Sequence, residues 1–205
     1  MGAKIEEVDY ERIPEHAKSM RNTGKLLKKQ IDEAYAELDK LRNVWYGVRY
    51  NELIKGFNKI IPDLDKIMEL VITSFPYTLE VVANNYSRAD KGTDATSADN
   101  SKPTKISEIQ PNTKVGMKYL DAEAETARAL VVTKLKNATN MMNNIENIYK
   151  KITWKSEASQ AFEKTFRELK KKIVEEFQNL EKEFTKQMKA ASQDINSAES
   201  SNTVK

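Results

Sequence analysis

Few residues in this sequence are of the types that catalyse reactions or bind metal ions. The 205 residues include one histidine, His16, and no cysteine. A thiolate nucleophile, a disulfide and a two-histidine zinc centre are therefore excluded within one chain. The carboxylates of Asp63 and Asp65 lack the glycine and the further oxygen ligands of a calcium loop. Because there is also no serine–histidine–acid set and no glycine-rich phosphate loop, we expect a protein that is not an enzyme and binds no cofactor or metal.

The composition indicates long helices with charged outer faces. Hydrophobic residues make up 39% and charged residues 32% of the chain, with only 6 glycines and 5 prolines. So few turn-forming residues argue against a β-sandwich or a β-barrel. The 34 basic and 31 acidic side chains leave a net charge of +3. Since no segment carries an uncompensated basic stripe, we expect no binding to nucleic acid.

Apolar residues recur at steps of three, four or seven in two segments, which predicts amphipathic helices. The segments 1–90 and 115–205 each contain two such stripes, interrupted at Trp45 and at Trp154. The polar stretch 91–114 between them is predicted to be a flexible linker. The stripes of the first segment are Ile13, Ala17, Met20, Leu27, Ile31, Ala34, Leu38 and Leu41, then Leu53, Phe57, Ile60, Leu64, Met68, Val71, Phe75, Leu79, Val82 and Tyr86. Those of the second are Val131, Leu135, Ala138, Met141 or Met142, Ile145 and Ile148, then Phe162, Phe166, Leu169, Ile173, Phe177, Leu180, Phe184, Met188, Ala191 and Ile195.

The two segments follow one plan. When Trp45 is aligned with Trp154, an offset of 109 residues, Leu53 falls on Phe162 and the stripes match without a gap. Before the tryptophan the match needs a shift of about two residues, as expected for a turn of variable length. The sequence therefore predicts a tandem repeat of two helical hairpins, each with a tryptophan at its turn.

Two short motifs lie at defined places in these hairpins. Trp45-Tyr46-Gly47 occupies the first turn, and Tyr86 and Asp90 lie one helical turn apart at the end of the second helix. A hairpin with W-x-G at its turn and Y-x-x-x-D at its end resembles the WXG hundred-residue family. That family consists of small type VII secretion substrates of Gram-positive bacteria. The resemblance covers nearly the whole chain, as two copies joined by the linker.

The resemblance implies both a fold and an export signal. In that family two hairpins pair antiparallel as a four-helix bundle. The W-x-G turn of one partner then lies near the Y-x-x-x-D tail of the other, and together they form a composite export signal. Carried onto this chain, the turn role falls on Trp45, Gly47 and Trp154, and the tail role on Tyr86 and Asp90.

The second copy departs from the family pattern in two places. Ser156 stands where the glycine of W-x-G is expected, so this turn motif is Trp154-Lys155-Ser156. Ile195 and Glu199 stand where the tyrosine and the aspartate of the tail are expected. Only one complete tail signal is therefore present, and it lies inside the chain.

The length of the linker favours antiparallel pairing on separate grounds. Helices of about 38 residues are about 57 Å long, and antiparallel hairpins require the linker to travel that length. The 24 residues of 91–114 can span at most about 80 Å, whereas parallel hairpins would need only a short turn. We therefore expect an all-α, intramolecular, antiparallel four-helix bundle that is monomeric, with Trp154 close to the Tyr86–Asp90 tail.

The start of the chain bears on localisation. Met1–Pro14 is acidic and lacks the apolar core of a signal peptide. Glu6 stands where a myristoylation signal requires serine or threonine. The longest apolar runs are far short of a membrane span. We therefore expect a chain that is cytoplasmic before export, is secreted without a cleavable signal peptide, and makes no stable insertion into membranes.

Function is expected to be protein–protein recognition, as a secretion substrate or adaptor in the manner of that family. The resemblance implies the type VII ATPase as a partner, with a co-secreted effector and a role in virulence as further implications. Two other classes stay open: a membrane-active toxin whose amphipathic helices rearrange onto lipid, and a cytoplasmic coiled-coil adaptor. Heptads sustained without a tryptophan turn would favour the adaptor, and a gene beside a type VII ATPase would favour export.

Overall fold

Four helical segments form the structure, as the paired apolar stripes predict. The computed structural model describes residues 8–202; the N-terminal features at residues 1–7, Glu6 among them, lie outside this range. The elements in chain order are α1 (Ile13–Lys40), the 3-10 turn η1 (Leu41–Asn43), β1 (Trp45–Tyr46), α2 (Val48–Lys59), α3 (Ile61–Glu69), the π-helical turn η2 (Leu70–Ser74), α4 (Phe75–Lys91), β2 (Lys118–Tyr119), α5 (Asp121–Lys150) and α6 (Glu157–Ser201).

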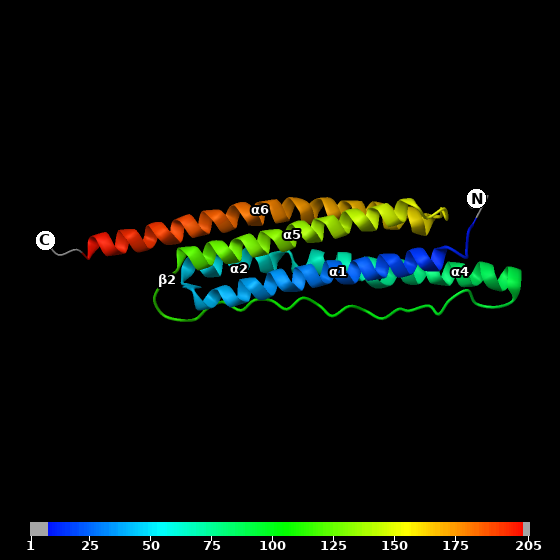
Figure 1. The fold of residues 1–205 in the computed structure, drawn as a ribbon, viewed down its shortest axis with the longest axis horizontal. Coiled ribbons are helices and arrows are strands. Elements are labelled where there is room, and N and C mark those ends of the chain that lie inside the picture. Colours follow the sequence, from blue (N-terminus) through cyan, green and yellow to red (C-terminus); the bar gives the residue numbers. More distant parts are fainter. Residues whose placement is uncertain (1–7, 203–205) are drawn as a thin grey trace.

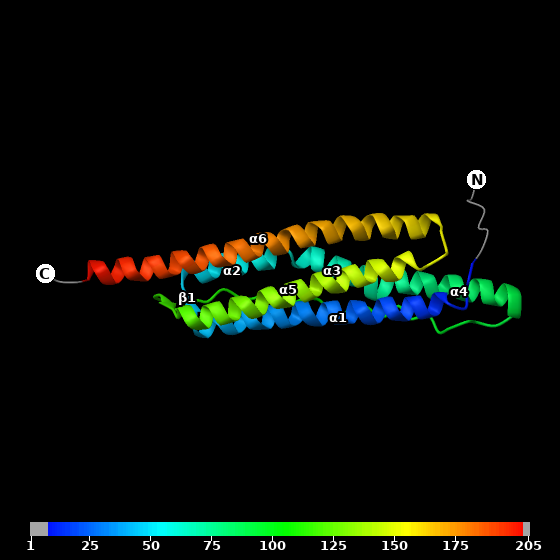
Figure 2. The same ribbon diagram turned by 45° about the horizontal axis from the view of Figure 1, so that its top comes forward.

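The two hairpins pack antiparallel. Helix α1 lies along α5, while α2 and α3 lie along α6. The turn between α1 and α2 and the turn between α5 and α6 lie at opposite ends of an elongated rod (Figures 1 and 2). The predicted antiparallel four-helix bundle is therefore confirmed.

The core consists of the predicted stripe residues. Every stripe residue named for α1 is buried, and on α6 burial follows the stripe from Phe162 to Ala191. The stripes weaken at their ends, where Val82, Tyr86 and Ile195 are only half-buried. Each hairpin thus buries its apolar face on the other, which supplies most of the stability of long amphipathic helices.

The second helix of the first hairpin is broken, although its apolar period continues through Pro62 and Pro76. The sequence predicts one helix through both prolines, each of which can remove a backbone hydrogen bond and kink the axis. In the structure Pro62 lies in the first turn of α3 and Pro76 in the first turn of α4. Proline is tolerated there because the first N–H groups of a helix have no intrahelical acceptor. The π-helical turn η2 joins α3 to α4, so the three helices continue along one side of the rod (Figure 2).

The segment after α4 is an extended strap on the outer side of the first hairpin. The sequence predicts a flexible linker over 91–114; in the structure α4 continues to Lys91, and Gly92 ends it with a φ of 76°. The chain then runs back along the hairpin (Figure 1) and buries Ile106 and Ile109 against it. We call residues 93–114 the strap.

Side-chain amides hold the strap backbone. Asn58 donates to the Ile109 carbonyl at 2.9 Å and accepts from the Ile109 N–H at 3.1 Å. The amide of Asn51 pairs with Asn112 in the same two ways, at 3.1 and 2.9 Å. Such paired bonds satisfy a backbone N–H and a backbone C=O with a single side chain.

The spacing of these contacts explains the extended form of the strap. Asn51, Asn58 and Asp65 follow one another at steps of seven residues, about 10.5 Å along a helix. Their strap partners lie three residues apart: Asn112, Ile109 and then Ile106, whose N–H donates to Asp65 at 3.0 Å. Three residues of extended chain also span about 10 Å. The helix and the strap therefore stay in register.

Candidate functional site

The first turn is organised around Trp45. Its side chain is 1% exposed, and its ring lies 5.2 Å from that of Tyr119 and 6.2 Å from that of Phe184, measured between centroids. The backbone of Trp45 also pairs with Tyr119 in the antiparallel β1–β2 ladder. The tryptophan therefore joins the turn to β2, which follows the strap, and to α6, and aromatic contacts of this kind stabilise beyond their buried area.

Gly47 is required by the backbone of this turn. Its φ is +116° and its ψ is −171°, a region that only glycine occupies without strain. Glycine at this place lets the chain leave β1 and enter α2 directly, where the Gly47 carbonyl accepts from the Asn51 N–H at 3.2 Å. The glycine of the W-x-G motif thus has a local conformational cause.

The second turn also leads directly from a tryptophan into the next helix, but its backbone geometry differs. Trp154 is buried, but Ser156 has a φ of −145°, which any residue adopts. Its hydroxyl accepts from the Ser159 N–H at 3.2 Å and caps α6. Serine in place of glycine is therefore explained: this turn needs an N-cap instead of a positive φ.

We expect exchange of the residues at the two turn positions to destabilise the protein to very different extents. Gly47→Ser should destabilise the protein by about 1–3 kcal/mol, because serine would be forced into a glycine-only conformation. Ser156→Gly should cost only a few tenths of a kcal/mol, since glycine is an acceptable N-cap. Urea unfolding of both variants would measure the difference, and an equal loss at both positions would contradict the assignment.

Tyr86 and Asp90 lie near the end of α4, where the apolar stripe runs out. Tyr86 is half-buried and Asp90 is exposed. The Tyr10 hydroxyl donates to the Asp90 carboxylate, and this bond raises the pKa of Tyr10 above its usual value. Lys91 donates to Glu11 in the next contact along the chain. The tail of α4 is thus bound by the segment that precedes α1, a contact that no periodicity in the sequence indicates.

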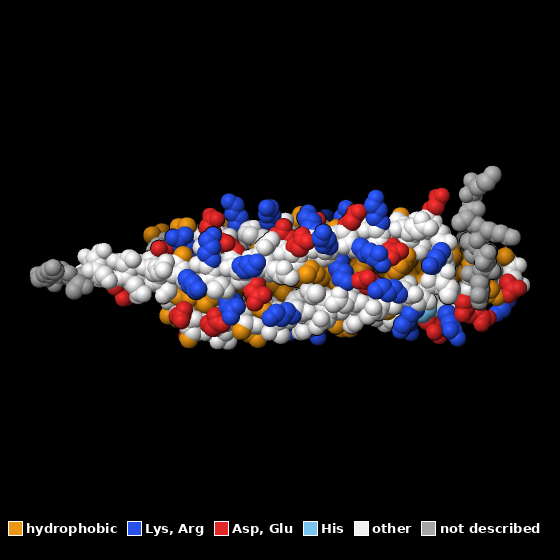
Figure 3. Space-filling model, turned by 90° about the horizontal axis from the view of Figure 1, so that it is seen from above, with side chains coloured by type: hydrophobic (Ala, Val, Ile, Leu, Met, Phe, Trp, Pro, Cys, Tyr) orange, Lys and Arg blue, Asp and Glu red, His pale blue; other side chains and the backbone are white. Residues whose placement is uncertain are grey.

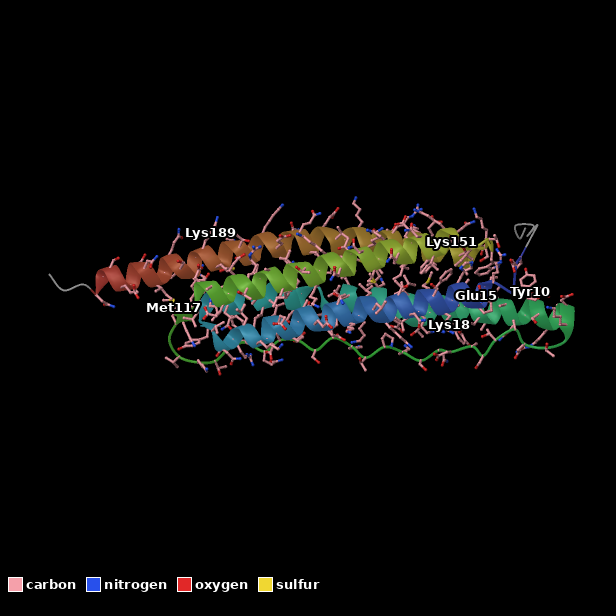
Figure 4. The ribbon with its side chains drawn as sticks, in the orientation of Figure 1. Tyr10, Glu15, Lys18, Met117, Lys151 and Lys189 are labelled. Carbon is pink, nitrogen blue, oxygen red and sulfur yellow. The ribbon has the colours of Figure 1, made fainter. Side chains whose placement is uncertain are left out.

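The tail extends past the second turn. Phe75, at the start of α4, stacks on Phe162 with centroids 3.8 Å apart. From this level Asp90 lies about 22 Å further along α4, whereas Ser156 lies only about 9 Å away along α6. The C-terminal end of α4, which carries Asp90, and the α5–α6 turn therefore occupy the same end of the rod, and α4 extends beyond the turn (Figure 1). Figure 4 shows Tyr10 and Lys151 at this end and Met117 at the other.

His16 lies at the same end and is half-buried. Partial burial lowers the pKa of His16 below its usual value, and the positive charge of Lys151 lowers it further.

The two aspartates considered as calcium ligands make structural contacts instead. Asp63 pairs with Lys172 at 2.7 Å, and Asp65 accepts a hydrogen bond from the strap. Within residues 8–202, no group of three His, Cys, Asp or Glu side chains is arranged to hold a metal ion.

A buried ion pair on the strap side was not predicted from the sequence. Arg21 of α1 donates to the Glu80 carboxylate of α4, at 3.0 Å from Nη2, and to the Ile72 carbonyl at 3.0 Å. Arg21 also donates to the Asp99 carbonyl of the strap at 2.8 Å, and the Asp99 N–H donates to Glu80 at 2.9 Å. The pair thus joins two helices, the π-helical turn and the strap.

Comparison with known proteins gives no relative for this chain. No family model matches it, and no curated protein and no solved structure matches it. None of the helices described for residues 8–202 is both apolar enough and long enough to span a bilayer. A functional assignment therefore has to come from the two turns, the α4 tail and the surfaces of the bundle.

Proposed function

We propose that this chain is a type VII secreted helical-hairpin protein in which one polypeptide does the work of the family's usual dimer. It acts by protein–protein recognition, as a secretion substrate or adaptor for a co-secreted effector. The observation that carries the proposal is the placement of its motifs: a W-x-G turn with a glycine-only backbone, a second tryptophan turn at the opposite end of the rod, and a Y-x-x-x-D tail that extends past that second turn.

The bundle supports a single-chain substrate. The apolar stripes of both hairpins are buried against each other, so the described part of the chain needs no second copy to cover them. Arg49 of α2 pairs with Asp194 of α6 at 2.9 Å, and Lys134 of α5 donates to Glu33 of α1 at 2.6 Å. These contacts link the two hairpins to each other, in the way that two separate chains are linked in a dimer.

The α4 tail has the properties of a recognition element. Asp90 is exposed and lies at a helix C-terminus, where a negative charge opposes the helix dipole. The bond that its carboxylate accepts from the Tyr10 hydroxyl lies at the surface, where a hydrogen bond adds only modestly to stability, so the main benefit of this carboxylate lies in contact with a partner. We propose the type VII ATPase as the partner that binds Tyr86 and Asp90.

We expect Asp90→Ala to abolish or sharply lower secretion in a type VII-competent host while the melting temperature stays unchanged or rises slightly. The matched control is Tyr10→Phe, which removes the same hydrogen bond and leaves the carboxylate in place. Tyr10→Phe should be secreted normally. Glu199→Ala should matter less than Asp90→Ala, because Ile195 stands where the tail motif has tyrosine.

The measurement is the amount of protein in the medium relative to the cells, with circular dichroism of each purified variant. Equal loss of secretion in Asp90→Ala and Tyr10→Phe would assign the effect to the hydrogen bond and not to recognition. Normal secretion of folded Tyr86→Ala and Asp90→Ala would reject the export signal.

A further inference from the structure

A groove of about 500 Å³ runs between α5 and α6 on the solvent side of the second hairpin. Its floor is apolar and consists of Val132 and Leu135 of α5 with Val174 and Phe177 of α6. Its rim is polar. Figure 3 looks onto this side of the rod and shows apolar side chains among the lysines and arginines.

The tandem repeat identifies the corresponding groove of the first hairpin. For residues after the turn, the two copies align with an offset of 109, so Val174 corresponds to Asp65 and Glu181 corresponds to Ile72. Before the turn the offset is 111 residues, because the first turn is two residues longer. This second offset is supported by pairs of residues that are buried in both copies: Met20 and Val131, Leu27 and Ala138, Ile31 and Met142, and Ala34 and Ile145.

The corresponding groove carries the strap. The offset of 111 places Val132 on Arg21, which donates to the strap at the Asp99 carbonyl. Val174 corresponds to Asp65, which accepts from the strap at the Ile106 N–H. One chain therefore contains the same groove twice, and in the first copy an extended polypeptide lies in it.

We propose that the α5–α6 groove binds an extended segment of a partner protein, in the way that the first groove binds the strap. Arg21 and Asp65, which contact the strap in the first groove, correspond to Val132 and Val174, so the floor of the second groove favours apolar side chains of the partner. The amides of Asn140 and Gln178 on the rim are of the type that holds strap backbone elsewhere, as Asn58 does. This inference does not depend on the export signal.

The spacing of the groove sets the pattern of the partner. Val174 and Glu181 are seven residues apart on α6, about 10.5 Å, which three residues of an extended chain match. In the first copy the same seven-residue step joins Asn58 to Asp65, and the strap residues bound there, Ile109 and Ile106, are the two that the strap buries. The partner segment should therefore carry two apolar residues three positions apart.

The test uses random twelve-residue peptides displayed on phage and selected on the purified chain. An enriched sequence is then synthesised and its affinity measured for the wild type and for three variants. Two variants change the groove. Val174→Asp introduces the residue that the first copy has at position 65, and Asn140→Lys introduces the residue that it has at position 29. Val48→Asp is the control, because Val48 is an exposed apolar residue of α2 outside this groove. Thermal unfolding checks that each variant is folded.

We expect affinity to fall at least about tenfold in both groove variants and to stay unchanged in the control. When the peptide binds, hydrogen exchange of the backbone amides should slow over 132–140 and 174–181. The carbon-13 NMR chemical shifts of the bound peptide should be those of an extended chain. The proposal is overturned if no sequence is enriched, if both groove variants bind normally, or if the bound peptide is helical.

Discussion

Replacing Glu80 by alanine should destabilise the protein by about 3–5 kcal/mol, the usual cost of removing one partner of a buried ion pair. The side chain of Glu80 is 5% exposed and that of its partner Arg21 is 11% exposed. Without the carboxylate, the buried guanidinium would keep the Ile72 and Asp99 carbonyls as hydrogen-bond acceptors, and its remaining countercharge would be the half-exposed Asp99 carboxylate at 3.9 Å. The strap would also lose its bond from the Asp99 N–H.

Urea unfolding of Glu80→Ala measures this loss. The control is Asp94→Ala, which breaks the exposed pair with Arg88 and should leave the melting temperature unchanged, because exposed pairs contribute little. Amide exchange should also rise along the strap in Glu80→Ala alone. A loss below about 1 kcal/mol would mean that Arg21 and Glu80 are solvated and do not form a buried link.

Phe57→Ala and Phe166→Ala should each destabilise the bundle by about 3–5 kcal/mol, through lost burial and the cavity that remains. Both side chains are 1% exposed. The ring of Phe57 meets that of Tyr35 edge-on at 6.1 Å and lies 6.4 Å from Phe184, so it contacts helices of both hairpins. Phe166 lies 5.5 Å from Phe162.

Chemical denaturation of the two variants measures the loss, with Tyr77→Ala as the control because Tyr77 is a large exposed side chain of α4. Tyr77→Ala should change stability by less than about 0.5 kcal/mol. If both phenylalanine variants lose less than about 1 kcal/mol, the apolar stripe does not form the core.

The helices were predictable because an amphipathic helix repeats its apolar residues every three or four positions. The antiparallel pairing was also predictable, since the linker is longer than a parallel arrangement requires. The strap was not. Asn51, Asn58 and Asp65 belong to the polar face of a helix, and a polar residue that binds water looks the same in the sequence as one that binds backbone. Their seven-residue spacing was the only available signal.

The candidate site was predictable in part. Trp45, Gly47 and Trp154 stood out by type and position, and the structure gives Gly47 a conformational reason. The bond from Tyr10 to Asp90 joins residues 80 positions apart, and no local pattern specifies such a contact. The pairing of Trp45 with Tyr119 was equally hidden, because strands of two residues have no period that can be recognised.

The most direct test of the central proposal is secretion of the wild-type chain from two hosts that differ only in the type VII ATPase. The chain should accumulate in the medium of the host that has the ATPase and stay in the cells of the host that lacks it. A cytoplasmic marker should stay in the cells of both. Folded protein that remains in the cells of both hosts, or that reaches the medium equally in both, would contradict the proposal.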